Sequence, residues 1–409
     1  MKANLSKKPL ATDASLLKQI NFTRILSLLR YLPHLTRAQI AHRTGLTRST
    51  VTLITAELIE AGLVREGKST ASGTEGGRPG IELELNPEGA FFIGVAIEDE
   101  ILRVVELNFA AQVTRRVEIP ITDTAPDIIA QQLIELIQQV WEANPESKAR
   151  SRGIGITIPG SLDRQGIVLR APRLGWKNID LRTYLDLYLD VPLYIENDAN
   201  AGALAEMYLS GSMPSHSLLY LFLNVGIGAG MVLNNRLVRG AGGTASEVSE
   251  LMIDPHDSDT PADVRPGTFE ALCSKRGLLH AYYRRTGEII NLETLLCCLE
   301  GGDAIAQAVV NEWGKYLSWG VRGLVGVLNP EQIVFGGQLA GLIPYVRDQF
   351  DEMLQGCLPD GSGYGFDQAA RFRLKISRFG KDSTAIGGAV LVYQSLFQMP
   401  DLLLLHHIV

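Results

Sequence analysis

A short run of hydrogen-bonding side chains near the N-terminus suits contacts with the bases and phosphates of a nucleic acid. The run consists of Thr47, Arg48, Ser49, Thr50 and Thr52. Thr47 is expected to cap a helix. This places the other members of the run on the exposed first turns of that helix, where side chains reach base edges in a major groove. Two preceding arginines, Arg37 and Arg43, are expected to approach phosphates.

The elements that position this run are predicted to form a helix-turn-helix. Three helical segments joined by short turns fit residues 14–61, and the second segment begins after Pro33 with Thr36 as its N-cap. The packing positions of the motif are occupied by Ala41, Gly45, Val51 and Ile54. We expect a close helix crossing at the alanine, a left-handed turn at the glycine and burial of the two aliphatic side chains. A plain three-helix bundle with a solvated polar face is the alternative.

Two strand patterns follow the helices and predict a β-hairpin wing. They cover residues 62–67 and 81–85, and the glycine-rich segment between them contains Arg78. An arginine on such a segment can enter a narrow minor groove, where A·T-rich sequence concentrates negative potential. Arg78 is therefore a further candidate DNA contact, and a disordered wing tip is the alternative.

The charge of the chain is unevenly distributed. Residues 1–56 hold nine Lys or Arg and one acid, a charge of +8, although the whole chain carries −7 at neutral pH. The remaining residues therefore carry −15. A basic head on an acidic body indicates that one domain meets phosphates while the other has a different task.

The composition excludes membrane-spanning, fibrous and disordered classes of protein. Hydrophobic residues make up 46% of the chain and charged residues 20%, and 409 residues suffice for two or three ordinary domains. The chain has no apolar run near the roughly 20 residues of a transmembrane helix, and its basic start lacks a signal-peptide core. We expect a cytoplasmic protein without membrane insertion. The four cysteines have neither disulfide nor zinc spacing and are interpreted as buried thiols.

After residue 90, apolar strand patterns alternate with amphipathic helices, which predicts an α/β architecture. The expected strands cover residues 91–97, 102–107, 153–158, 193–195 and 218–223. A turn-rich break at 209–217 divides two such sets, so we expect two lobes with a cleft between them. We place the domains at 1–86, 87–212 and 213–409, with the C-terminal helix returning to the first lobe.

Six motifs of the body, taken in their order and spacing, resemble those of the ROK family of repressors and sugar kinases. The motifs are Gly153–Gly160, Leu174–Trp176, Glu196–Asn200, Gly226–Gly230, Gly240–Glu247 and Asn329–Gly337. The resemblance covers nearly the whole chain and implies a two-lobed hexokinase/actin-like ATPase fold. The winged head resembles the regulators of the family, such as the glucose and N-acetylglucosamine repressors, rather than its free-standing kinases.

The resemblance also implies a sugar site between the lobes. A sugar needs amides and carboxylates in a fixed array, because its hydroxyls both donate and accept hydrogen bonds. By resemblance, Asn197 binds sugar hydroxyls, Asp198 stands where the kinases have their general base, and Glu247 and Glu270 match two sugar-contacting acids. The alternatives are a helix cap at Asp198 and a solvated helix face for the two glutamates.

One departure from the family pattern concerns Glu250, which stands where a histidine normally touches both sugar and zinc. The segment Ser246–Glu250 reads Ser-Glu-Val-Ser-Glu, whereas the family has Gly-Glu-x-Gly-His. The family's cysteine cluster is also missing from residues 254–268, and structural zinc requires thiolate or imidazole ligands. We expect Glu250 to contact the sugar, and we expect neither zinc nor another cofactor. A hard cation on the acidic loop 254–263 stays open.

A second departure concerns the phosphate-binding loops. The kinases have Asp-x-Gly-x-Thr in their first hairpin, whereas this chain has Ala96 in place of the metal-holding acid and Glu98, Asp99 and Glu100 in the turn. A carboxylate about 5 Å from a phosphate oxygen repels it by roughly 3 kcal/mol at an effective dielectric of about 20. The second loop, usually Gly-Thr-Gly, reads Asn-Val-Gly over Asn224–Gly226. We therefore expect no phosphoryl transfer and no catalytic residues.

These patterns are typical of a sugar-responsive regulator that binds a double-stranded DNA operator, a repressor by family habit. One short recognition helix makes too few base contacts for genomic specificity, so a homodimer or homotetramer is expected. One alternative is an ATP-dependent sugar kinase with a DNA-binding head. Another is a regulator with a vestigial cleft whose protein partner docks elsewhere, with the apolar tail 400–409 as a possible handle.

Overall fold

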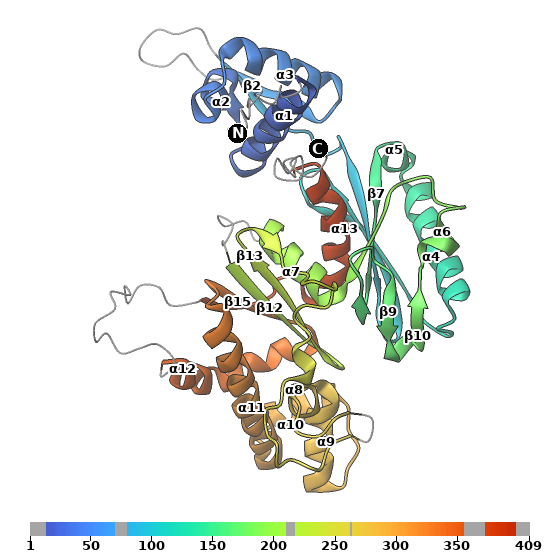
Figure 1. Cartoon of the computed structure of the whole chain (residues 1–409), viewed down its shortest axis with the longest axis vertical. Helices are drawn as coiled ribbons and strands as arrows, with labels where there is room; N and C mark the ends of the chain where they lie inside the picture. The colour runs from blue at the N-terminus through green and yellow to red at the C-terminus, as the bar shows by residue number, and fades with distance from the viewer. Residues whose placement is uncertain (1–13, 70–79, 210–216, 262–263, 356–372, 398–409) are drawn as a thin grey trace, which may run out of the picture.

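The computed structural model describes residues 14–69, 80–209, 217–261, 264–355 and 373–397, which form a small N-terminal head and two larger lobes (Figure 1). Arg78 and the apolar tail at 400–409 lie outside the described residues, so the expectations about them stay predictions.

The head is a winged helix-turn-helix, which confirms the predicted fold class of this part. Its elements are α1 Ala14–Tyr31, β1 Leu35–Thr36, α2 Arg37–Thr44, α3 Arg48–Glu60, β2 Val64–Ser69 and β3 Ile81–Leu85. Strand β3 pairs antiparallel with both β1 and β2, so the wing hairpin is anchored to the connection between α1 and α2.

Local hydrogen bonds fix the ends of the two helices that form the motif. Thr36 accepts a bond from the amide of Gln39, whose side chain accepts one from the amide of Thr36, so α2 begins with a capping box. Gly45 ends α2 at a left-handed φ of 71°, and Thr47 caps α3 by accepting from the amide of Thr50 at 3.2 Å. The alanine and the two aliphatic residues predicted to pack inward are buried.

The first lobe is built on a five-stranded sheet in the order β11-β7-β4-β5-β6. The strands are β4 Phe91–Ile97, β5 Ile101–Asn108, β6 Val113–Pro120, β7 Ser151–Ile158 and β11 Leu193–Asn197. The first three are antiparallel, whereas β7 and β11 run parallel to β4. The amphipathic helix α4 Pro126–Ala143 shares a buried apolar cluster with β4, β5 and β7 and so covers one face of the sheet.

Short elements surround this sheet. They are α5 Pro145–Ala149, β8 Ser161–Leu162, β9 Val168–Ala171, the 3₁₀ turn η1 Pro172–Leu174, β10 Trp176–Ile179 and α6 Arg182–Leu185. Strands β8, β9 and β10 form a small antiparallel sheet of their own. Turn η1 leads from β9 to β10 and carries one residue of the site described below.

The second lobe repeats the topology of the first in the order β14-β13-β12-β15-β16. Its strands are β12 Ser217–Leu223, β13 Ile227–Leu233, β14 Arg236–Leu237, β15 Gln332–Gly336 and β16 Arg373–Ile376. Its helices are η2 Val248–Glu250, α8 Phe269–Cys273, α9 Lys275–Thr286, α10 Leu292–Glu300, α11 Ala304–Leu328, η3 Gln338–Val346 and α12 Arg347–Gln355. Two sheets of one topology confirm the predicted hexokinase/actin-like α/β fold.

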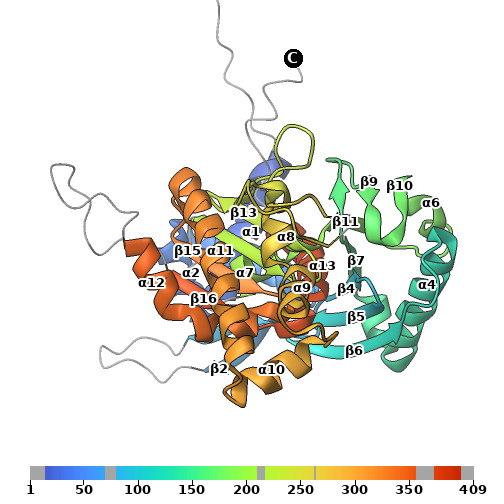
Figure 2. The same cartoon turned by 90° about the horizontal axis from the view of Figure 1, so that it is seen from below.

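Two adjacent helices, α7 Asp198–Leu209 and α13 Ser383–Ser395, lie between the sheets (Figures 1 and 2). Helix α13 follows the 3₁₀ turn η4 Gly380–Asp382 near the end of the chain, yet it packs against β4 and β7 of the first lobe as well as against α7. The approach is close enough that a Cβ at Gly94 of β4 would overlap the carbonyl oxygen of Ala385. Glycine is therefore required at this crossing.

The head and the body share one apolar core. A continuous cluster of buried side chains includes Ile25 and Leu29 of α1, Ala203 of α7 and Val390 of α13. Separate clusters fill the outer side of the first lobe and the inside of the second. The shared cluster means that the head rests directly on the two central helices.

The interpretation of all cysteines as buried thiols was wrong for Cys297. Cys273 is buried and Cys298 half-buried, but Cys297 is exposed, because neighbouring positions on the amphipathic α10 cannot both face the core. In the part of the chain that the structure describes, no helix combines the length and apolarity needed to cross a bilayer.

We expect Gly94→Ala to destabilise the protein by about 1–3 kcal/mol, since the added methyl group forces α13 away from β4. Gly323→Ala, on the exposed side of α11 where no atom lies within 4 Å of the new Cβ, is the control and should be neutral or stabilising by about 0.5–1 kcal/mol. Urea unfolding followed by circular dichroism measures both. Equal midpoints for the two variants would contradict this account of the crossing.

Candidate DNA interface and interlobe site

The predicted DNA-reading side chains lie together at the start of α3. Thr47, Arg48, Ser49 and Thr52 are exposed and Thr50 is half-buried. The Thr47 hydroxyl lies 2.9 Å from that of Ser49 and 2.8 Å from that of Thr50, so the N-cap also orients its two neighbours. This face offers hydroxyl and guanidinium groups, which are the kinds of side chain that contact base edges in a major groove.

Sequence reasoning missed Leu53, whose side chain is 61% exposed on the same face. The helical spacing of apolar residues could have revealed it. The buried residues of α3 follow the stripe Val51, Ile54 and Leu58, and residue 53 falls outside this stripe. An apolar side chain among donors on a recognition helix suits the methyl group of a thymine.

The two arginines expected at phosphates have different surroundings. Arg43 is exposed at the end of α2. Arg37 lies 2.9 Å from the carboxylate of Glu66 on the wing strand and donates to the hydroxyl of Thr55 at 3.1 Å. Arg37 thus ties α2 to α3 and to the wing, and part of its charge is already neutralised.

The candidate sugar residues Asn197 and Asp198 stand where β11 ends and α7 begins. Asn197 donates through Nδ2 to the carbonyl of Gly160 at 3.0 Å and accepts through Oδ1 from the amide of Asn200 at 3.0 Å. Asp198 Oδ1 accepts from the amide of Ala199 at 2.8 Å. The amide side chain is therefore held in a fixed orientation, and the aspartate contacts the first amide of α7.

Burial raises the pKa of Asp198 to about 7. The backbone bond from Ala199 and the positive charge of Arg173 act in the opposite direction, whereas Asp99 and Glu98 raise the pKa further. At neutral pH this carboxyl group is therefore partly protonated, and the protonated form can both donate and accept a hydrogen bond. A group with that property can bind a hydroxyl in either sense.

Arg173 on η1 joins the two lobes beside Asp198. Its Nη1 lies 2.7 Å from Oδ2 of Asp99 in the first hairpin, and its Nη2 lies 3.8 Å from Oε1 of Glu270 on α8 of the second lobe. A Cβ at Gly226 would overlap that Nη2. The guanidinium therefore fills the space between the turn and the loop where the family's kinases bind phosphates, and sequence reasoning missed it.

The candidate glutamates lie in the second lobe. Glu270 is half-buried; burial raises its pKa, and Arg173 lowers it. Glu247 precedes η2, Glu250 is its last residue, and both are exposed. Partial desolvation, followed by the charges of Glu250 and Glu270, raises the pKa of Glu247, so the structure brings the three acids near one another. Ser246 adopts φ 68°, the left-handed region that explains why the family pattern has glycine there.

A second link between the lobes involves Glu196, the residue before Asn197 on β11. Arg239, which follows β14, places Nη2 2.7 Å from Oε2 of Glu196 on β11. Glu196 also accepts from the side chain of Asn200 at 3.0 Å, so its carboxylate fixes the start of α7. Two ion pairs, Arg173–Glu270 and Arg239–Glu196, thus join one lobe to the other near Asn197 and Asp198.

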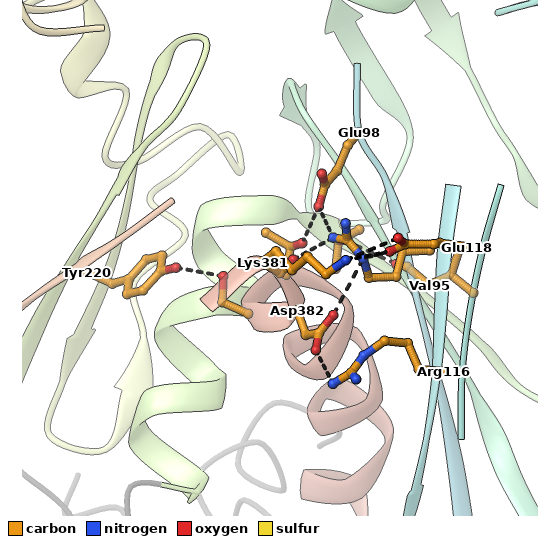
Figure 3. A network of polar contacts seen from close by, with 11 residues as sticks. Val95, Glu98, Arg116, Glu118, Tyr220, Lys381 and Asp382 are labelled. Atoms are coloured by element: carbon orange, nitrogen blue, oxygen red, sulfur yellow. Dashed lines mark hydrogen bonds and ion pairs between the residues drawn. The ribbon is translucent and has the colours of Figure 1, made fainter. Parts of the chain in front are cut away.

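A network of ion pairs and hydrogen bonds holds the first hairpin, β4 and β5, in place (Figure 3). Arg103 pairs across the hairpin with Ala96, and its buried guanidinium lies 2.7 Å from Glu98 and 3.0 Å from Glu118. Thr384 of α13 also donates to Glu98 at 3.3 Å. A magnesium-bound phosphate would meet these carboxylates in place of a metal-holding aspartate and donor amides, so the residues present do not fit that group.

The acidic loop does not fit the family's zinc. Its Asp259 lies 3.3 Å from His280 and 3.2 Å from Arg284, and these two side chains lower its pKa through hydrogen bonds. Among the residues that the structure places, no group of three or more His, Cys, Asp or Glu side chains has metal-binding geometry. Asp259 of this loop is thus engaged in ion pairs with α9 of the second lobe.

A winged helix-turn-helix seated on two lobes of a sugar-kinase fold defines a class of DNA-binding proteins built on an ATPase-like scaffold. The chain belongs to the ROK family, whose sequence profile matches residues 98–395. A winged helix-turn-helix DNA-binding profile matches residues 23–65.

Known proteins resemble the chain over nearly its full length. The xylose repressor of Caldicellulosiruptor bescii is 28% identical over 407 residues, which cover 95% of this chain and 98% of the relative. A crystal structure of a ROK family transcriptional regulator, a homolog of the Escherichia coli MLC protein, is 25% identical with a TM-score of 0.76 over 93% of this chain and 97% of that one. The ROK hexokinase of Thermus thermophilus is also 25% identical, with a TM-score of 0.62 over 75% of this chain and 99% of its own.

We expect Asp198→Asn to stabilise the protein more at about pH 8 than at about pH 5. The Asp198 carboxyl has a pKa of 3.8 in the unfolded chain and of about 7 in the folded chain, so the folded chain holds this proton more tightly. The ionisation of Asp198 therefore costs more folding free energy as the pH rises from 3.8 to about 7. The amide keeps the acceptor for Ala199 and removes this cost. Thermal midpoints at both pH values measure the effect, with exposed Asp190→Asn as the control. A gain independent of pH would refute the raised pKa.

Proposed function

We propose that this protein is a sugar-responsive DNA-binding repressor whose kinase-like sensor does not transfer phosphate. The observation that carries the proposal is the interlobe site itself. Asn197, Asp198 and Glu270 supply side chains of the kind that bind sugars, and Arg173 lies beside Asp198 and pairs with Asp99 and Glu270. The full-length likeness to a xylose repressor and to a homolog of the MLC protein supports the same function.

The sugar would lie between the lobes and contact residues from both. The first lobe would supply the side chains of Asn197 and Asp198. Gly160 and Asn200 hold the amide of Asn197 in place, and the pKa of Asp198 is about 7. Glu247, Glu250 and Glu270 supply acids from the second lobe. A ligand that touches both lobes stabilises one relative orientation of the lobes, which is the differential contact that an effector needs.

The sensor would bind no nucleotide. Ion pairs of Arg173 with Asp99 and of Arg103 with Glu98 occupy the first hairpin, and carboxylates repel phosphate. The alternative sugar kinase is favoured by the likeness of both lobes to the Thermus hexokinase. It requires ATP to break those pairs, and purified protein supplied with ATP, magnesium and sugar should yield no sugar phosphate under our proposal.

The head would bind the operator through the exposed face of α3, with Arg43 and Arg37 near phosphates and Arg78 near the minor groove. Because one short helix reads few bases, we propose a homodimer or homotetramer that reads two half-sites. The domain boundaries that follow are 1–86 for the head and 87–212 and 213–409 for the lobes. An operator-binding protein must share a compartment with its DNA, so we place it in the cytoplasm.

We expect Arg48→Ala to weaken operator binding by about 10- to 100-fold through loss of a base contact. The operator is first obtained by selecting bound duplexes from a random pool, and fluorescence anisotropy at fixed salt then gives the affinities. Arg347→Ala, an arginine on α12 of the second lobe, is the control and should bind normally. Equal affinities of the two variants would argue against α3 as the reading helix.

Substitution of the sugar residues should remove the response to the effector and leave DNA binding intact. We expect Asn197→Ala and Glu270→Gln to abolish the change in operator affinity that the effector sugar causes in the wild type. The first removes an amide side chain from the site, and the second replaces a charged acceptor with a neutral amide that donates from one side. The exposed Glu142→Gln is the matched control. A full sugar response in both site variants would show that the sugar does not bind through these residues and would contradict this placement of the site.

A further inference from the structure

Arg30, near the end of α1, occupies an aromatic cage formed by the body of the protein. Its Nη2 donates to the carbonyl of Tyr208 at 2.8 Å. Its guanidinium carbon lies 4.7 Å from the ring centre of Tyr208, 5.5 Å from that of Tyr393 and 5.2 Å from that of Phe397. Tyr31 of the head adds a fourth ring at 4.6 Å. A head residue is thus bound by the last turn of α7 and by the end of α13.

Both helices that form the cage begin at the interlobe site. Helix α7 starts with Asp198, and about 12 residues at 1.5 Å each make it a stiff rod of about 18 Å that ends beside Tyr208. Helix α13 starts at Ser383, which accepts a bond from the Tyr220 hydroxyl of the second lobe at 3.0 Å. The next residue, Thr384, contacts Glu98 of the first hairpin. Each rod therefore connects the site to the cage.

The body side of the cage is itself rigid. Tyr393 packs edge-on against Phe92 of β4 at 5.1 Å, and Phe397 stacks on Phe109 at 5.9 Å. The rings cannot shift independently of α13 and the first-lobe sheet. A change in the relative position of α7 and α13 therefore changes the shape of the cage that holds the guanidinium.

We infer that Arg30 is a positioning residue through which the effector site sets the orientation of the DNA-reading head. This inference rests on the proposed function, because it assigns the route by which that function is regulated. Guanidinium is suited to the role, since it stacks on several rings and donates a directed bond to a carbonyl at the same time. When the lobes move, α7 and α13 move at their ends, and the head follows through Arg30.

The chain offers a matched control on the same helix. Arg24 also lies on α1 and also donates through Nη2 to a backbone carbonyl, that of Thr44, at 2.7 Å, but this bond lies within the head. Arg24→Met and Arg30→Met each remove one such bond and keep an unbranched, helix-forming side chain. A purely structural role of α1 arginines affects both variants alike, whereas a positioning role affects only the second.

The test uses the full chain, its selected operator, and the sugar that shifts operator affinity in the wild type. We expect the wild type and Arg24→Met to change operator affinity by the same factor, within the 5- to 150-fold range typical of effectors. In Arg30→Met that factor should fall below about 2, while sugar still raises its thermal midpoint. Retention of the full factor in Arg30→Met would overturn the inference.

Hydrogen exchange at residues 205–209 of α7 tests the docking without any effector. Loss of the cage should speed exchange there in Arg30→Met and leave Arg24→Met like the wild type, and unchanged exchange in Arg30→Met would also overturn the inference. If no sugar alters operator affinity in the wild type, the proposed function fails. The exchange result then decides alone whether Arg30 docks the head.

Discussion

The close packing of α13 between the first-lobe sheet and α7 is the contact on which the rest of the structure depends. It brings the end of the chain back to β4, where Gly94 leaves room for the carbonyl of Ala385. It aligns two rods that reach from the interlobe site to the head, and it completes the apolar core that the head shares with the body. This crossing therefore fixes the positions of the two lobes, the interlobe site and the head relative to one another.

In our proposal the interlobe site keeps the polar array for a polyol, and the protein's own charged side chains occupy the space that a bound phosphate would need. Arg173 neutralises Asp99 and contacts Glu270, and the buried Arg103 does the same for Glu98 and Glu118. Such pairs link the hairpin, the second lobe and the start of α13. The lobe movement that serves turnover in a kinase can therefore serve signalling in a regulator, because both need two orientations of the lobes.

The sequence was sufficient for the parts governed by local rules. The caps at Thr36 and Thr47, the turn at Gly45 and the strand periods predicted the head, four strands of the first-lobe sheet and β12 of the second within a few residues. Strands β6, β13, β14, β15 and β16 were not predicted. Contacts between distant segments were beyond such rules. The spacing of residues in α1 does not show that Arg30 contacts the body while Arg24 contacts the head. The residues next to Arg173 do not show that it contacts Asp99 and Glu270, because only the tertiary fold brings those partners together.

The most direct test of the central claim is the thermal unfolding midpoint of the purified full chain against a panel of sugars, sugar phosphates and ATP with magnesium. A ligand that binds only the folded state raises the midpoint. The account predicts a rise with one sugar or sugar derivative and no change with ATP and magnesium. A clear rise with ATP would contradict the loss of the phosphate site, and no rise with any sugar would contradict the sensor.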